Sequence, residues 1–346
     1  MKRTLHVAML ALAVASAALA SDALAQNKQT RSQNNNTPAG AQPALPTLPA
    51  SDAVVLVELR RLISEELPRA LASDAPRLAA VNADIDAFKT RTGIDPRAFD
   101  TLAAGSRFMS LAGGKTKLTH TVAVARGTFD MAAIVAALRA SSKGNHREQK
   151  HAGKSVHVFT LNEEVKLFGL LGVRVRDLAV AELDRTTLAV GHPAAVLAAI
   201  DAARGRGALR ASDLTVLTQP RAASTLVAFG GKVSATAFKD IDVGTPEISR
   251  SVASIREFYG ALSTTAGGYG MQTTLRTTGA ADAKSLGDTI GALKQLAPLF
   301  IGRLSGDRQR LAQSAVESLQ VSAQGNEVRL SLEIAQGDIT TLVRTF

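Results

Sequence analysis

The residues best suited to chemistry lie in one predicted hairpin and are His146, Glu148 and His157. Ala152-Gly153 fits the two central positions of a tight β-turn, and a turn there pairs Glu148 with His157. Because side chains alternate along a strand, this register places all three residues on one face, where two imidazoles and a carboxylate are suited to Zn²⁺. The alternative is an ordinary solvated strand face, since Lys150 shares it and repels a cation, and a shift of one residue disperses the set.

Two arginine-rich segments are candidates for binding an anion. Guanidinium groups donate paired hydrogen bonds to phosphate and carboxylate oxygens. A short basic loop is equally typical of a solvated surface, so both interpretations stay open. The first set, which we take as the candidate anion site, is Arg204, Arg206 and Arg210, and the second set is Arg303, Arg308 and Arg310.

Two segments match only the end of a phosphate-binding loop. Gly114-Lys115-Thr116 and Gly153-Lys154-Ser155 carry the final Gly-Lys-Ser/Thr, but the motif needs another glycine five positions before its last glycine. Met109 and Glu148 occupy those positions. The sequence also contains no G-x-S-x-G nucleophile elbow and no H-E-x-x-H zinc motif. We therefore expect no nucleotide and no cofactor, and no residue is singled out as catalytic.

The composition bounds the possible partners. Hydrophobic residues make up 46% of the 346-residue chain, which is enough for packed cores. Aromatic residues make up only 4%, which disfavours nucleic acid because single-stranded sites stack bases on aromatic rings. The absence of cysteine excludes disulfides and thiolate metal sites. A net charge of +10 favours an anionic partner, such as an anionic component of the cell envelope, or another envelope protein.

The N-terminus reads as a leader for export. Lys2-Arg3 precedes the apolar run Val7–Leu19, and Ala23-Leu24-Ala25 gives a small-x-small cleavage pattern. Cleavage is expected after Ala25, with Ala20 as a second possible site. We therefore predict a signal peptide over residues 1–25 and a periplasmic or secreted protein with no transmembrane segment in its mature chain.

The rest of the chain divides into a tether and two folded units. Residues 26–49 are rich in Gln, Asn and Pro and predict a disordered tether. Residues 50–211 and 212–346 each show the order hairpin, helix, hairpin, helix. The fold class expected is α+β: two related units, each an antiparallel sheet with helices packed on one face.

The longest predicted helix, Ala280–Ile301, has an apolar stripe at helical spacing. We expect this stripe to face the core. The segment Leu296–Leu304 has an alternative role, because an apolar helix end followed by arginines also suits a membrane surface. The stripe consists of Leu286, Ile290, Leu293, Ala297 and Phe300.

Three structural motifs carry a family resemblance. They are Leu48-Pro-Ala-Ser-Asp-Ala53 before an apolar strand, Gly93-Ile-Asp-Pro96, and Gly127-Thr-Phe-Asp130 before a helix. Together they resemble exported bacterial proteins that begin with a leader, an L-P-x-x-A motif and a strand, and that repeat an α+β unit. The resemblance implies export and this fold, and it implies no catalytic residues.

The function predicted from the sequence is a non-enzymatic binding or interaction module of the bacterial cell envelope. The first alternative is a hydrolase whose polar residues meet only in the folded chain. The second is a metal-binding protein that uses the hairpin histidines His146 and His157. A cleft that holds a nucleophile within reach of a base would favour the hydrolase.

Overall fold

The computed structural model describes residues 47–110, 116–167, 171–233 and 246–345. The predicted leader, most of the tether and Gly114-Lys115 of the first incomplete phosphate loop lie outside these residues. The strands are β1 (Ala53–Val57), β2 (Phe99–Ser110), β3 (Thr116–Gly127), β4 (His146–His151), β5 (Lys154–Leu167), β6 (Leu171–Asp184), β7 (Thr187–Gly191), β8 (Thr225–Lys232), β9 (Ile255–Thr264), β10 (Gly268–Thr277), β11 (Gln320–Gln324) and β12 (Glu327–Ala335).

The helices precede, interrupt and follow these strands. A π-helical turn, Leu62–Glu66, joins the helix Leu59–Arg61 to the helix Leu67–Ala70. Short 3₁₀ turns lie at Pro96–Ala98, Ala211–Asp213 and Thr215–Leu217. The α-helices are α2 (Leu59–Arg61), α3 (Leu67–Ala70), α4 (Ala75–Thr92), α5 (Met131–Ser141), α6 (Pro193–Ala202), α7 (Pro246–Ala253), α8 (Ala280–Ile301), α9 (Gly306–Ser318) and α10 (Gln336–Thr345).

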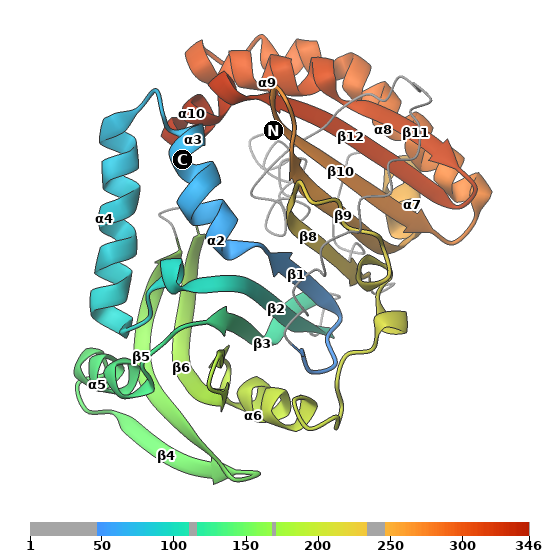
Figure 1. The fold of residues 1–346 in the computed structure, drawn as a ribbon. Coiled ribbons are helices and arrows are strands. Elements are labelled where there is room, and N and C mark those ends of the chain that lie inside the picture. Colours follow the sequence, from blue (N-terminus) through green and yellow to red (C-terminus); the bar gives the residue numbers. More distant parts are fainter. Residues whose placement is uncertain (1–46, 111–115, 168–170, 234–245, 346) are drawn as a thin grey trace, which may run out of the picture.

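All the described strands belong to one antiparallel sheet, ordered β11-β12-β10-β9-β8-β1-β2-β3-β7-β6-β5-β4 (Figure 1). The N-terminal strand β1 lies at its centre. Val55 pairs with Ala104 of β2 on one side and with Phe229 of β8 on the other. The expectation of α+β architecture is confirmed, but the expectation of two separate sheets is wrong, because β1 joins both halves into a single sheet.

The two halves wind in a similar order. In the first, β3 is followed by α5 and by strands that return until β7 pairs with β3. In the second, β10 is followed by α8 and α9 and by strands that return until β12 pairs with β10. The second half makes this return with two strands and the first with four. An internal duplication stays a prediction.

Helices cover both faces of the first half of the sheet. Val156 and Val158 of β5 pack with Val196 and Ile200 of α6 on one face. Phe159 of the same strand packs on the other face, in a cluster that contains residues of α4 and α5. The expectation that helices pack on one face only is therefore wrong here. The reason is the alternation of β5, which carries apolar side chains on both faces at Val156–Phe159.

The second half has helices on one face and a polar network on the other. Met271 of β10 belongs to one apolar cluster and Leu275 to another, and α8 contributes Leu286 to the latter. On the opposite face, Arg276 of β10 binds Glu257 of β9 at 2.8 Å and Glu327 of β12 at 2.9 Å. An antiparallel sheet with one covered and one polar face accounts for this arrangement.

Local sequence signals set the ends of α4. Asp74 caps its N-terminus, because its carboxylate accepts a hydrogen bond from the backbone N–H of Arg77 at 3.1 Å. Gly93 ends the helix at φ +71°, and its backbone N–H donates to the Lys89 carbonyl. Gly93 also touches α5, since a Cβ built on it would lie 2.7 Å from Ile134 Cα. The backbone at the end of α4 therefore lies directly against the backbone of α5 at Gly93.

Candidate functional site

The structure confirms the predicted register of the central hairpin. Glu148 pairs with His157, and His151 pairs with Lys154. The turn residues Ala152 and Gly153 have φ of +49° and +76°, the positive values that a two-residue type I′ turn requires. His146, Glu148 and His157 therefore share one face of the hairpin.

The two imidazoles on that face contact each other. His146 Nε2 lies 3.2 Å from His157 Nδ1, and the His146 ring stacks on Phe159 with centroids 4.8 Å apart. A Glu148 carboxylate oxygen lies 3.9 Å from His157 Nδ1. Within the described ranges, no group of three or more His, Asp or Glu side chains is arranged to hold a metal ion. The geometry supports a hydrogen-bonded histidine pair, and a metal site at these residues stays a prediction.

The environment of His146 disfavours its charged form. Burial is the largest cause that lowers the pKa of His146 below its ordinary value, and the positive charges of Arg139 and His157 lower it further. Glu148 opposes this shift. His146 is therefore held mainly neutral in the folded protein at neutral pH.

Acidification is expected to destabilise the protein in part through His146. The unfolded chain takes up a proton at the ordinary pKa of 6.5, whereas the folded chain takes it up only at lower pH. Stability is therefore lost as the pH falls below that value, and His146→Gln should lose less of it. Urea unfolding at about pH 7 and about pH 5 measures the effect. The pKa of His192 is also lowered, by burial and by His120, so the variant should still lose some stability on acidification. An equal acid-induced loss in both proteins would contradict the prediction.

The candidate anion site at Arg204, Arg206 and Arg210 is divided in the folded chain. Arg206 donates to Asp201 Oδ1 at 2.6 Å, and His151 Nε2 lies 2.9 Å from Asp201 Oδ2. The hydrogen bonds from His151 first, and then from Arg206, lower the pKa of Asp201. Arg206 is therefore committed to a carboxylate. Arg204 does not join this pair and lines a pocket with Lys154 of the hairpin. Anion binding by all three arginines stays a prediction.

The C-terminal half of α8 exposes large apolar side chains. Leu299 is 69% exposed, Phe300 is 50% exposed, and Leu293 and Leu296 are each 48% exposed. We call these four residues the α8 tip. Leu286 is spaced seven residues before Leu293 on the same helix face, yet it is buried. The expectation that this stripe faces the core is confirmed at Leu286 and is wrong at Leu293 and Phe300.

The packing of α8 against β11 explains which part of the helix is buried. A Cβ on Gly287 would lie 3.2 Å from Ala323, so α8 packs closely against β11 at this point. One end of the strand is reached at Lys294, whose ammonium group donates to the Leu319 carbonyl. The helix continues for two more turns beyond that contact, and the α8 tip overhangs the sheet. Although α8 has 22 residues, no helix within the described ranges is both long and apolar enough to cross a membrane.

The surroundings of the α8 tip are basic. The guanidinium of Arg303 lies 5.8 Å from the ring centroid of Phe300. Arg308 is exposed on the next helix. Arg310 is more constrained, since it pairs with Asp307 at 3.5 Å and donates to Thr341. Of the second arginine set, Arg303 is thus the residue that adds positive charge directly beside the apolar surface.

The sequence left two roles open for Leu296–Leu304, a core-facing helix end and a contact with a membrane surface, and the exposure of Leu296, Leu299 and Phe300 contradicts the first. Helical spacing shows which residues share a face, but not which part of that face is covered. The last two turns of α8 also carry Leu296 and Leu299 outside the predicted stripe. An apolar band that widens at a helix end indicates a surface prepared for a partner.

Comparisons with known proteins yield only a distant structural likeness. No protein-family model matches the chain, and no curated protein matches its sequence. Solved structures of TP0453 from Treponema pallidum are similar. Crystal form III has a TM-score of 0.44 and 10% identity, with 88% of this chain and 100% of that chain covered. Crystal form I has a TM-score of 0.40 and 10% identity, with 89% and 98% covered. With TM-scores below 0.5 and 10% identity, this likeness supports no conclusion about the present chain.

Proposed function

We propose that the protein is a non-enzymatic binding module of the bacterial cell envelope that attaches to an anionic lipid surface through the α8 tip. The observation that carries this proposal is the exposure of four large apolar side chains on a helix that overhangs the sheet. Apolar patches rimmed by polar residues are typical of interaction surfaces. The predicted leader places the protein where such surfaces are found.

The size of the apolar surface indicates weak and reversible attachment. Complete burial of a Leu or Phe side chain contributes about 1.5–3 kcal/mol, so a side chain that is half exposed contributes about 1 kcal/mol on insertion. Four such residues supply roughly 4 kcal/mol, which is less than one acyl chain provides. Attachment by the α8 tip alone would therefore be readily reversible.

Charge favours a lipid surface over a neutral apolar partner. Residues 289–310 contain four basic residues and one acidic residue. Arg303 and Arg308 are both exposed, and Arg303 lies against the ring of Phe300. Each basic residue near an anionic membrane adds about 1 kcal/mol, and this contribution weakens with salt. An apolar helix end with flanking arginines is suited to the boundary between headgroups and acyl chains.

Vesicle co-sedimentation tests the proposal. The mature protein is expected to bind vesicles of phosphatidylglycerol and phosphatidylethanolamine more tightly than vesicles of phosphatidylcholine. The double variant Leu296→Ser/Leu299→Ser removes about 2 kcal/mol of insertion energy and should bind about 30-fold more weakly. Arg303→Gln should weaken binding to the anionic vesicles about fivefold and leave phosphatidylcholine binding unchanged.

A matched control is available on β2. Met109 is 43% exposed and lies away from α8, so Met109→Ser removes a comparable apolar surface. This variant should bind vesicles as the unchanged protein does. Equal binding by the α8 double variant and the Met109 variant would overturn the proposal. Failure of the unchanged protein to bind any vesicle would do the same, and would leave a protein partner as the occupant of the α8 tip.

A further inference from the structure

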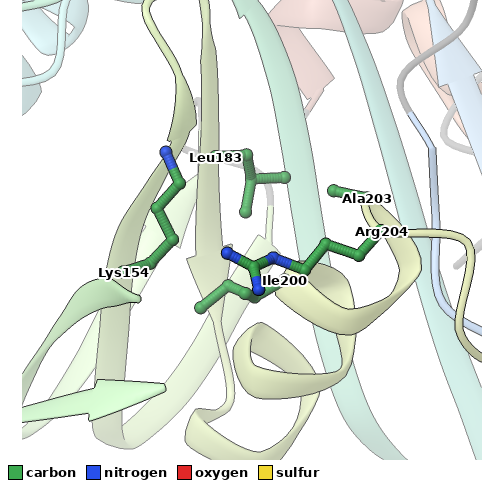
Figure 2. Close-up of a pocket in the computed structure, with 5 residues that line it drawn as sticks. All are labelled: Lys154, Leu183, Ile200, Ala203 and Arg204. Atoms are coloured by element: carbon green, nitrogen blue, oxygen red, sulfur yellow. The ribbon is translucent and has the colours of Figure 1, made fainter. Parts of the chain in front are cut away.

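A pocket lies between the central hairpin and the end of α6, far along the sheet from α8. Lys154 begins β5 and forms one wall, and Arg204 follows α6 and forms the other. Leu183, Ile200 and Ala203 supply the apolar lining. Figure 2 shows Arg204 extending across Ile200 toward Lys154, while the Lys154 side chain rises from a different element on the side of Leu183.

The two cations of this pocket have no acidic partner among the residues that the structure describes. The salt bridges of the described chain include neither Lys154 nor Arg204. The carboxylate at this end of α6, Asp201, is already occupied on both oxygens by His151 and Arg206. Two like charges that line one pocket repel each other, and an anion placed between them would relieve this repulsion.

The walls of the pocket are held in place. The hydrogen bond from His151 to Asp201 ties the hairpin to α6. The type I′ turn brings Gly153 to Arg204, since a Cβ on this glycine would lie 3.5 Å from an Arg204 guanidinium nitrogen. Leu183 and Ile200 are buried members of the core cluster beneath α6. Lys154 and Arg204 are thus presented by rigid elements, which lowers the cost of ordering them around a ligand.

The lining selects the class of ligand. The pocket is a shallow, open cavity of about 80 Å³, far below the volume of a drug-sized site, so it can seat an anionic head and only the first carbons of a tail. Its polar groups on the walls are donors, and its floor is aliphatic. A small ligand with an anionic head and a short apolar tail satisfies both parts, because the head pairs with the two cations and the tail covers Leu183 and Ile200.

We propose that the pocket formed by Lys154, Arg204, Leu183, Ile200 and Ala203 binds a small amphiphilic anion, with a carboxylate or phosphate head held between Lys154 and Arg204. This site differs from the predicted site at Arg204, Arg206 and Arg210. Arg206 pairs with Asp201, and the second cation of the pocket is Lys154 of the hairpin. The pocket is also independent of the α8 tip, which lies on the other half of the sheet.

Isothermal titration calorimetry on the mature chain tests this site with three probes: octanoate, octyl phosphate and acetate. Octanoate and octyl phosphate distinguish the two heads, and binding of either supports the site. Acetate carries the head without the tail and is expected to bind at least about tenfold more weakly. Lys154→Gln/Arg204→Gln should weaken binding of the preferred amphiphile about 100-fold, since each charge-assisted hydrogen bond is worth about tenfold.

Three further variants make the outcome specific. Lys143→Gln/Arg185→Gln removes the same charge from exposed positions and should leave the affinity unchanged. Ala203→Glu keeps both cations but supplies an internal carboxylate, and it should abolish binding. Leu296→Ser/Leu299→Ser should have no effect, which separates this site from the α8 tip. Equal affinity of the Lys154/Arg204 variant and the unchanged protein, or no binding of either amphiphile by the unchanged protein, would overturn the proposal.

Discussion

Arg276→Met is expected to lower the free energy of unfolding by about 3 kcal/mol. Arg276 binds Glu257 and Glu327 from the two neighbouring strands, and it also donates to the Thr215 hydroxyl at 2.8 Å. The side chains of Glu257 and Glu327 are only 14% and 16% exposed. Removal of the arginine leaves two poorly solvated carboxylates without a cation. The expected loss lies at the lower end of the range for breaking a buried ion pair, because the Arg276 side chain itself is 33% exposed.

The pH dependence of this deficit gives a second measurement. Burial alone would raise the pKa of Glu327, but the hydrogen bond from Arg276, with those from Tyr259 and Arg329, holds it below the ordinary value of 4.5. A lowered carboxylate pKa contributes stability above the ordinary value, and this contribution is lost as the pH falls through the folded-state pKa. The deficit of Arg276→Met should therefore shrink on acidification.

Arg329→Met is the matched control for this network. Arg329 also reaches Glu327, at 3.3 Å, but its side chain is 57% exposed. An exposed ion pair contributes less than about 1 kcal/mol, so this variant should unfold at nearly the same urea concentration as the unchanged protein. Similar losses in the two variants would show that the network acts through general surface charge and not through the buried carboxylates.

Gly93→Ala is the second substitution with a large expected effect, a loss of about 3 kcal/mol in the free energy of unfolding. The left-handed conformation at φ +71° costs an alanine about 1 kcal/mol. The new methyl group would also meet the backbone of Ile134 at 2.7 Å. Since the obstacle is backbone and not the end of a flexible side chain, α4 and α5 must separate, which costs roughly 2 kcal/mol more.

Gly144 offers a control with the same left-handed backbone conformation and no neighbouring atoms that a new methyl group would meet. It follows α5 at φ +83°, and a Cβ there would meet nothing within 4 Å. Gly144→Ala should therefore lose only the conformational part, about 1 kcal/mol. Urea unfolding followed by far-ultraviolet circular dichroism measures both variants. A loss at Gly93 no greater than the loss at Gly144 would show that the α4–α5 approach tolerates a methyl group.

Short-range signals predicted the local structure well. The register of the β4–β5 hairpin followed from one two-residue turn, because turn type fixes which residues face each other. The helix Ala280–Ile301 is confirmed at both ends. In contrast, the sequences of Glu163–Leu167 and Leu171–Val175 have no clear periodicity, yet the first belongs to β5 and the second to β6. Alternating hydrophobicity identifies a strand that is buried on one face, and it gives no signal where the residues of a strand do not alternate between apolar and polar.

The candidate sites depended on contacts that the sequence does not encode locally. Lys154 and Arg204 lie in different elements, and only the packing of α6 on β5 and β6 brings them to one pocket. Lys154 had seemed relevant only as part of an incomplete phosphate loop. The sequence could not decide between the core and the membrane role of Leu296–Leu304 for a related reason, since the exposure of the α8 tip depends on where β11 ends. Sites built by long-range packing need the fold before they can be recognised.

The central position of β1 has a consequence for the order of folding. Val55 of β1 must pair with Phe229 of β8, which is synthesised much later. Contacts this distant in sequence form slowly, because a long loop must close before the pairing contributes any stability. Until β8 arrives, one side of β1 is an unpaired strand edge, the kind of surface that associates with other chains. The β1–β8 seam therefore closes only after the first half of the chain has been made, and the interval before it closes is one in which the exposed edge of β1 favours aggregation.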